Sequence, residues 1–303
     1  MAHTFSENEI LYLTVINKIK AEIQLVAQDA TNNTRQAQLH AKAALGLLIQ
    51  EDPVVNTTWT SQISELNPRV TADLLKSLND LQNSTGSSAA SGSISSSSIQ
   101  SKVASIDNLL DEAATVRINS NLLNNPKTQA LVLANLGNEI YYSYGKALGI
   151  PQSTIASMGG MKMTGMSMNT TTDSSSASKG MSGMNMSNIE SSMNMGAGSN
   201  GGARSAMNSM NGQAAMNQNN SSIKNMTAYQ TAQSLAAIAQ QVFIKNFKPI
   251  EPSNATSPTT SIGKYIDELK SDIKDKASFA AIMETVHVRL HPTLINTFKL
   301  PTG

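Results

Sequence analysis

Residues 6–26 read SENEILYLTVINKIKAEIQLV, and this stretch sets the pattern for the rest of the chain. Its apolar side chains recur at steps of three and four, as on one face of an α-helix: Ile10, Leu13, Ile16, Ile19, Ile23 and Val26. Ser6 and Glu9 have the spacing of a capping box, which satisfies free N–H groups at a helix start. The pattern predicts a helix over 6–50, kinked at the polar patch 31–34 and ended by Pro53.

The same periodicity predicts several more helices and no strand. One helical segment is expected from near Thr57, with a restart at Pro68 after a cap at Asn67. Others are expected over 99–118, from Pro126 to Gly149 and over 222–246. Of the last two, one starts at a cap at Ser261 and the closing one ends at Pro292. Aromatic residues make up only 4% of the chain, whereas Ala, Leu and Ile are plentiful, which suits packed helices. The fold class predicted is all-α, an up-and-down helical bundle with a long disordered Met-rich insertion.

Two low-complexity stretches divide this chain of 303 residues. Residues 84–98 form a Ser-rich linker, and residues 157–221 form a Met-rich low-complexity segment; neither has enough apolar residues to order itself. We expect residues 1–156 to be the N-terminal part of the bundle and residues 222–303 to be its C-terminal part.

Composition bears on partners and compartment. The net charge is +1 and no basic run interleaves with aromatics, so nucleic acid is not an expected partner. The chain has no cysteine, which is consistent with an oxidising compartment. Asn-x-Ser/Thr sites recur at Asn32, Asn56, Asn83, Asn169, Asn219, Asn220, Asn225 and Asn254. Together with the lack of cysteine, these sites favour an extracytoplasmic location. No apolar run is long enough for a membrane span, and residues 1–20 contain no signal peptide. Either the protein is cytoplasmic or its leader is absent from this sequence; we expect the second, a secreted or cell-surface protein.

Fourteen of the sixteen methionines fall between Met158 and Met226, in a background of Ser, Gly, Asn, Thr and Ala. Methionine commonly fills gaps in a core. The spacing argues against that use here, because at about 100° per residue the first five methionines scatter around a helix axis and form no apolar face. In a strand, the mixture of odd and even steps would place them on both faces.

A thioether is a neutral, soft donor that favours Cu(I) and needs no deprotonation to bind. The M-x-M and M-x-x-M spacing resembles the Met-rich copper-binding segments of extracytoplasmic copper-resistance and copper-transport proteins, over about a fifth of the chain. Those segments often include His or Asp, whereas this one has no His and only Asp173 and Glu190, which favours Cu(I) over Cu(II). The candidate ligands are Met158, Met161, Met163, Met166, Met168, Met181, Met184, Met186, Met193, Met195, Met207 and Met210.

Histidines outside this segment offer other candidate ligands. On one helix, Glu284, His287 and His291 would share a face, and with His40 they could form a mononuclear copper or zinc site. The alternative is that His287 and His291 finish a helix C-terminus, where imidazolium is favourable. His3 could hold Cu(II) together with the N-terminal amine and two backbone amides, or it could be an incidental terminal residue.

The sequence therefore predicts a non-enzymatic, extracytoplasmic protein that sequesters copper or hands it on to an acceptor protein through the Met-rich segment. No nucleophile elbow, phosphate-binding loop or zinc-protease motif occurs. In overall texture the chain also resembles predicted secreted helical proteins of ammonia-oxidising archaea. The alternative function is a cell-surface structural or interaction protein whose low-complexity stretches are glycosylated spacers.

Overall fold

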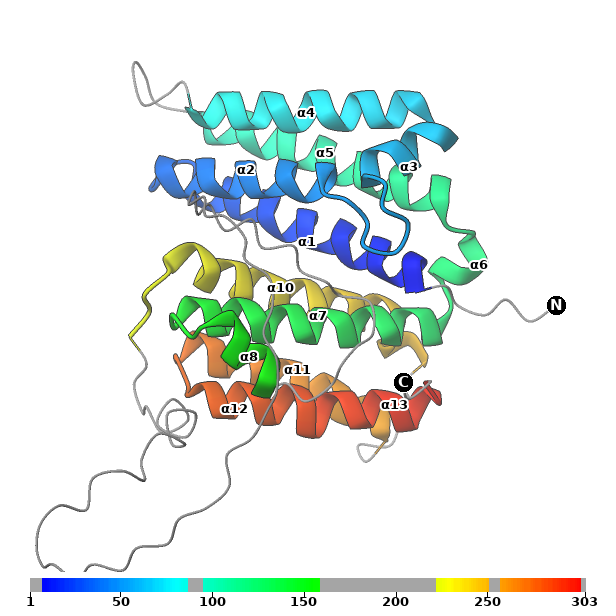
Figure 1. Cartoon of the computed structure of the whole chain (residues 1–303), viewed down its shortest axis with the longest axis vertical. Helices are drawn as coiled ribbons and strands as arrows, with labels where there is room; N and C mark the ends of the chain where they lie inside the picture. Colours follow the sequence, from blue (N-terminus) through cyan, green and yellow to red (C-terminus); the bar gives the residue numbers. More distant parts are fainter. Residues whose placement is uncertain (1–6, 87–94, 159–221, 251–256, 301–303) are drawn as a thin grey trace, which may run out of the picture.

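A computed structural model describes residues 7–86, 95–158, 222–250 and 257–300 (Figure 1). Among these residues no β-strand forms, and one isolated bridge joins Glu51 to Thr58. The predicted all-α bundle is confirmed. The helices are α1 (Glu7–Asp29), α2 (Thr34–Ile49), α3 (Trp59–Leu66), α4 (Pro68–Gly86), α5 (Ser96–Arg117), α6 (Ser120–Leu123), α7 (Pro126–Ala147), α8 (Gln152–Met158), α10 (Met226–Asn246), η2 (Lys248–Ile250), α11 (Pro258–Lys274), α12 (Phe279–Met283), η3 (Glu284–Leu290) and α13 (His291–Phe298).

The N-terminal half forms a four-helix bundle. Helix α1 packs on α2 and α5, and α4 closes the ring between them, with α3 lying across one end. Tyr12 and Trp59 fill that end with ring centroids 5.7 Å apart, and the Arg117 guanidinium lies 4.4 Å from the Tyr12 ring centre. The Tyr12 hydroxyl donates to the backbone carbonyl of Ala113 at 3.0 Å, so α1 and α5 are joined by both a hydrogen bond and packing.

The C-terminal half forms a second bundle from α7, α10, α11 and the continuous helical segment α12–η3–α13. Two buried tyrosines tie it together. The Tyr144 hydroxyl donates to the Ala277 carbonyl at 2.6 Å, and the Tyr229 hydroxyl donates to the Ile273 carbonyl at 2.9 Å. These carbonyls lie at and just after the C-terminus of α11, where a helix leaves its last C=O groups without internal partners.

The two bundles meet along α1, which packs against both α7 and α10. Figure 1 shows the result as successive layers along the long axis: α4 with α5, then α1 with α2, then α7 with α10, and finally α11 with α12–α13. Helix α8, the short helix after α7, packs back onto it. None of the described helices is long and apolar enough to cross a membrane.

Several predicted boundaries need correction. The break after α1 does fall at the polar patch, where the Asn33 side chain caps α2. The Ser-rich linker was predicted too long, because α4 continues to Gly86 and α5 starts at Ser96. Helix α11 is capped by Ser257 and not by Ser261, since the Ser257 hydroxyl accepts the Thr260 N–H at 3.1 Å. The sequence also gave no sign of α6 and α8, which are short.

The sequence predicted that the last helix ends at Pro292, and this prediction is wrong. Residues Glu284–Leu290 form a π-helix, and the His291 N–H donates to the Val286 carbonyl five residues earlier. Proline lacks an N–H and its ring clashes with the carbonyl four residues before it in an α-helix. The wider turn just before Pro292 relieves that clash, and α13 continues to Phe298.

Removing the two tyrosine hydroxyls should destabilise the second bundle. We expect Tyr144→Phe and Tyr229→Phe each to lower the free energy of unfolding by about 1 kcal/mol, because each removes a hydrogen bond to a backbone carbonyl at or just after the end of α11. The measurement is urea unfolding followed by far-UV circular dichroism. Tyr265→Phe is the matched control, since in the described residues the Tyr265 hydroxyl makes no hydrogen bond; an equal loss in the control would contradict this account.

Candidate functional site

The two ends of the Met-rich segment are held at the same place, the C-terminal end of α7. On the entry side, Ile155 of α8 is buried and its carbonyl accepts a hydrogen bond from the Tyr141 hydroxyl at 3.3 Å. On the exit side, the backbone N–H groups of Lys224 and Asn225 donate to the Ala147 carbonyl at 2.8 and 3.0 Å. The described residues on both sides of 159–221 are therefore attached to the C-terminal half of α7.

A glycine makes this junction possible. Gly149 follows the end of α7 with φ of 73°, a left-handed conformation that residues with a Cβ rarely adopt. A Cβ at this position would also lie 2.7 Å from Cδ of Lys224, which is too close for a stable contact. The sharp turn after α7 thus favours glycine through its backbone conformation, whereas the flexible Lys224 side chain could move to make room for a Cβ.

Methionine takes no part in the buried core of the described residues. Met158 ends α8 with its side chain partly buried against the core, and Met226 begins α10 with 48% of its surface exposed. The other candidate ligands of the segment, from Met161 to Met210, lie outside the described residues, as does His3. The core is built from Leu, Ile, Val, Ala and aromatic side chains instead.

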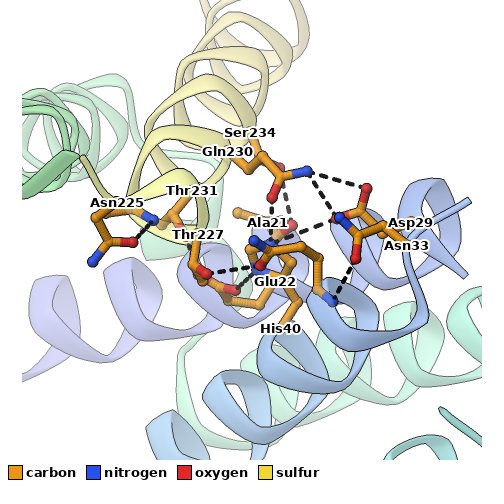
Figure 2. Close-up of polar contacts among 12 residues, drawn as sticks. Ala21, Glu22, Asp29, Asn33, His40, Asn225, Thr227, Gln230, Thr231 and Ser234 are labelled. Carbon is orange, nitrogen blue, oxygen red and sulfur yellow. Dashed lines mark hydrogen bonds and ion pairs between the residues drawn. The ribbon is translucent and has the colours of Figure 1, made fainter. Parts of the chain in front are cut away.

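His40 lies in a buried polar network where α1, α2 and α10 meet (Figure 2). Its Nδ1 is 2.6 Å from a carboxylate oxygen of Glu22, and its Nε2 is 3.3 Å from the amide oxygen of Gln230. Gln230 in turn donates to Asp29 at 2.8 Å, and the Thr231 hydroxyl donates to the other oxygen of Glu22 at 2.9 Å. Figure 2 shows the two α10 side chains directed toward α1 and α2.

The partners of His40 indicate that its ring is a cation. Both ring nitrogens face oxygen acceptors, and only imidazolium carries two N–H donors. Burial by itself lowers the pKa of His40, but the hydrogen bond and charge of Glu22, with Gln230 and Asp29, outweigh it and raise the pKa above its ordinary value of 6.5. Sequence reasoning found His40 but missed its partners; polar residues four apart on α1 (Thr14, Lys18, Glu22) were the available signal.

His287 and His291 lie together on the opposite bundle. His287 sits within the π-helix and His291 follows it, with ring centroids 5.1 Å apart at an angle of 82°. Burial, with the neighbouring His287, lowers the pKa of His291 to about 4, and burial lowers that of His287. His291 donates from Nε2 to the carbonyl of Ala134 at 2.9 Å. Gly137 permits this approach, because a Cβ there would lie 3.1 Å from His291 Nε2.

The structure does not bring the four predicted bundle ligands together. His40 contacts Glu22 of α1 and Gln230 of α10, whereas His287 and His291 pack on Tyr141 and Ala134 of α7. The Glu284 carboxylate is 61% exposed and lies 3.7 Å from Arg289. No group of three or more His, Asp or Glu side chains in the described residues is arranged to hold a metal. The alternative, a helix C-terminus at these histidines, is wrong because the helix continues through α13.

Comparison with known proteins adds no family assignment: no protein-family model matches this chain, and searches of curated proteins and solved structures find no significant similarity.

His40 should make the free energy of unfolding fall as the pH rises above the ordinary pKa of histidine. Its pKa is raised on folding, so its contribution to stability is present below pH 6.5 and is lost as pH rises through the folded-state pKa. We expect the free energy of unfolding to fall with increasing pH in this window. The measurement is urea unfolding at a series of pH values, with His40→Gln as comparison; a slope that survives in His40→Gln would rule out this histidine as its source.

His287 should be replaceable without loss of stability. Neither of its ring nitrogens has a hydrogen-bond partner among the described residues, and a buried unpaired polar atom costs about 1–3 kcal/mol. We expect His287→Leu, of similar volume, to keep or raise the melting temperature of the metal-free protein. His291→Leu is the matched control, and it should lower the melting temperature because it removes the hydrogen bond to Ala134. A lower melting temperature for His287→Leu than for the control would contradict this reasoning.

Proposed function

We propose that this protein binds Cu(I) outside the cytoplasm through the thioethers of its Met-rich segment, and stores the ion or passes it to an acceptor protein. The observation that carries the proposal is the separation of methionine from the core. Fourteen of sixteen methionines cluster within 158–226, while the buried core of the described residues contains none. A chain that uses methionine for packing would show the reverse.

The way the bundle holds the segment supports this role. Because residues 155 and 224 are both fixed to α7, the ends of the segment cannot separate. Joining the ends of a flexible chain lowers its conformational entropy and raises the effective concentration of its donors around one another. Several thioethers are thus available to one ion without a preformed cavity. At about three or four thioethers for each soft ion, the segment has enough sulfur for about three or four ions.

The chemistry of the donors favours Cu(I) over divalent ions. Thioethers are neutral and soft, and the segment contributes only two carboxylates, Asp173 and Glu190. Since methionine carries no proton to displace, binding should persist in mild acid, where imidazole and thiolate ligands are lost. Nothing in this proposal requires a catalytic role.

A second candidate is a cell-surface structural protein with glycosylated spacers. The observation that favours it is the exposure of Asn32 and Asn56, both in loops and both in Asn-x-Thr sites. This role needs glycans at these sites and in the segment, at Asn169 and Asn219, and it needs no methionine. Mass spectrometry of the protein from its native source distinguishes the two by glycan occupancy.

The proposal predicts multi-ion Cu(I) binding that depends on the segment's methionines. We expect the intact chain to remove about three or four Cu(I) ions from a chromogenic chelator under reducing conditions, at pH 7 and again at pH 5. The comparison is a full-length variant in which each methionine from Met161 to Met216 is replaced by alanine, with Met158 and Met226 kept because they belong to helices. It should retain at most one ion.

A matched control replaces serines of the same segment by alanine in equal number and should bind as the intact chain does. Equal copper binding by the intact chain and the methionine-free variant would contradict the proposal, as would the absence of binding in both.

A further inference from the structure

His287 carries a lone pair that the fold leaves unused. Both of its ring nitrogens are buried, and neither has a hydrogen-bond partner among the described residues. The ring meets Tyr141 edge to face, with centroids 4.7 Å apart and an angle of 83°. A ring N–H can be directed at an aromatic face, but the second nitrogen of a neutral imidazole is an acceptor, and an aromatic face has no proton to offer it. This acceptor nitrogen needs an explanation.

His291 supplies a second lone pair beside it. Its Nε2 lies 2.9 Å from the Ala134 carbonyl, and because a carbonyl only accepts, the proton must be on Nε2. Nδ1 of the neutral ring is therefore the free donor. An imidazole whose far N–H is held by a backbone carbonyl is the arrangement that fixes metal-ligating histidines in tautomer and orientation.

The surroundings decide which cation these donors suit. Val286, Leu290 and Phe279 are buried around the pair, whereas the nearest acidic side chain in sequence, Glu284, is exposed and faces Arg289. No carboxylate contributes to the pKa of His287 or of His291, so none offsets a second positive charge there, and burying an uncompensated charge is costly. A singly charged, soft ion that accepts few ligands is the best match for two neutral imidazoles.

Methionine provides a third donor on the same helical segment. Met283 is four residues before His287, about one turn along, and is partly buried against the core. It is the one methionine of the described residues that neither adjoins the Met-rich segment nor lies in it. Met283, His287 and His291 thus follow one another at intervals of four residues across the π-helix, an element that frequently marks functional sites.

We propose that His287 and His291, with the thioether of Met283, form a site for one Cu(I) ion, for which Ag(I) can substitute. The site is in the folded bundle and is distinct from the Met-rich segment, so each could exist without the other. His40 and Glu284 have no part in it. His287 is only half-buried as a residue, so an ion can approach the pair with small side-chain movement.

The test uses a full-length chain in which the methionines from Met161 to Met216 are alanine and His3 is Gln, with 15N-labelled histidine. One equivalent of Ag(I) is added, and the ring nitrogens are followed by long-range 1H–15N NMR. We expect one nitrogen of His287 and Nδ1 of His291 to shift, with saturation at one ion per chain, while both nitrogens of His40 stay unchanged. No shift at His287 and His291, or an equal shift at His40, would overturn the proposal.

Variants in the same background extend the test. His287→Leu should abolish the shift at His291, and Met283→Leu should weaken Ag(I) binding about tenfold; unchanged affinity in His287→Leu would also overturn the site. In the chain with its methionines intact, His287→Leu should reduce the number of bound Cu(I) ions by one and leave the others. If the methionine-free chain binds no ion, the histidine site is refuted and the Met-rich segment is not. If the intact chain binds a single ion that depends on His287, the Met-rich segment is refuted as a copper site and the histidine site is not.

Discussion

Helix α1 connects the two bundles, and its polar contacts to the second bundle constrain how they join. Its apolar face packs inside the first bundle, while Thr14, Lys18 and Glu22 follow at intervals of four residues on the face toward the second. Lys18 pairs with Glu139 of α7 at 2.9 Å, and Glu22 accepts a hydrogen bond from the Thr231 hydroxyl of α10 at 2.9 Å. Losing one partner of a buried pair typically costs about 3–5 kcal/mol, so these contacts select one register between the bundles.

This fixed register holds in place the helix to which both flanks of the Met-rich segment are attached. Helix α7 is held by α1 on one side and by α13 on the other, and the segment leaves and rejoins the fold at its C-terminal end. Under the proposed function, buried residues of the bundle can therefore be selected for stability while the segment is selected for metal binding. This separation of roles is consistent with a core built from branched and aromatic side chains, without buried methionine among the described residues.

The sequence predicted the helices well because their apolar side chains recur with helical spacing, as from Ile10 to Val26. It could not predict the π-helix, because Pro292 inside a helical pattern normally signals a helix end, and the wide turn that precedes it leaves no signal in the spacing of apolar residues. Nor could it join His40 of α2 to Glu22 and Asp29 of α1 and to Gln230 of α10, because α10 lies far from the other two helices in the chain. Spacing along one helix grouped Glu284 with the histidines, but tertiary packing placed its carboxylate in solvent.

The central claim, that sulfur of the Met-rich segment is the copper ligand, is tested most directly by X-ray absorption spectroscopy of the intact protein loaded with Cu(I). We expect an edge typical of Cu(I) and a first shell dominated by sulfur, with a minor nitrogen contribution from the histidine pair. The spectrum should be the same at pH 5 and pH 7, since thioethers do not titrate. A first shell made only of nitrogen and oxygen would contradict the claim.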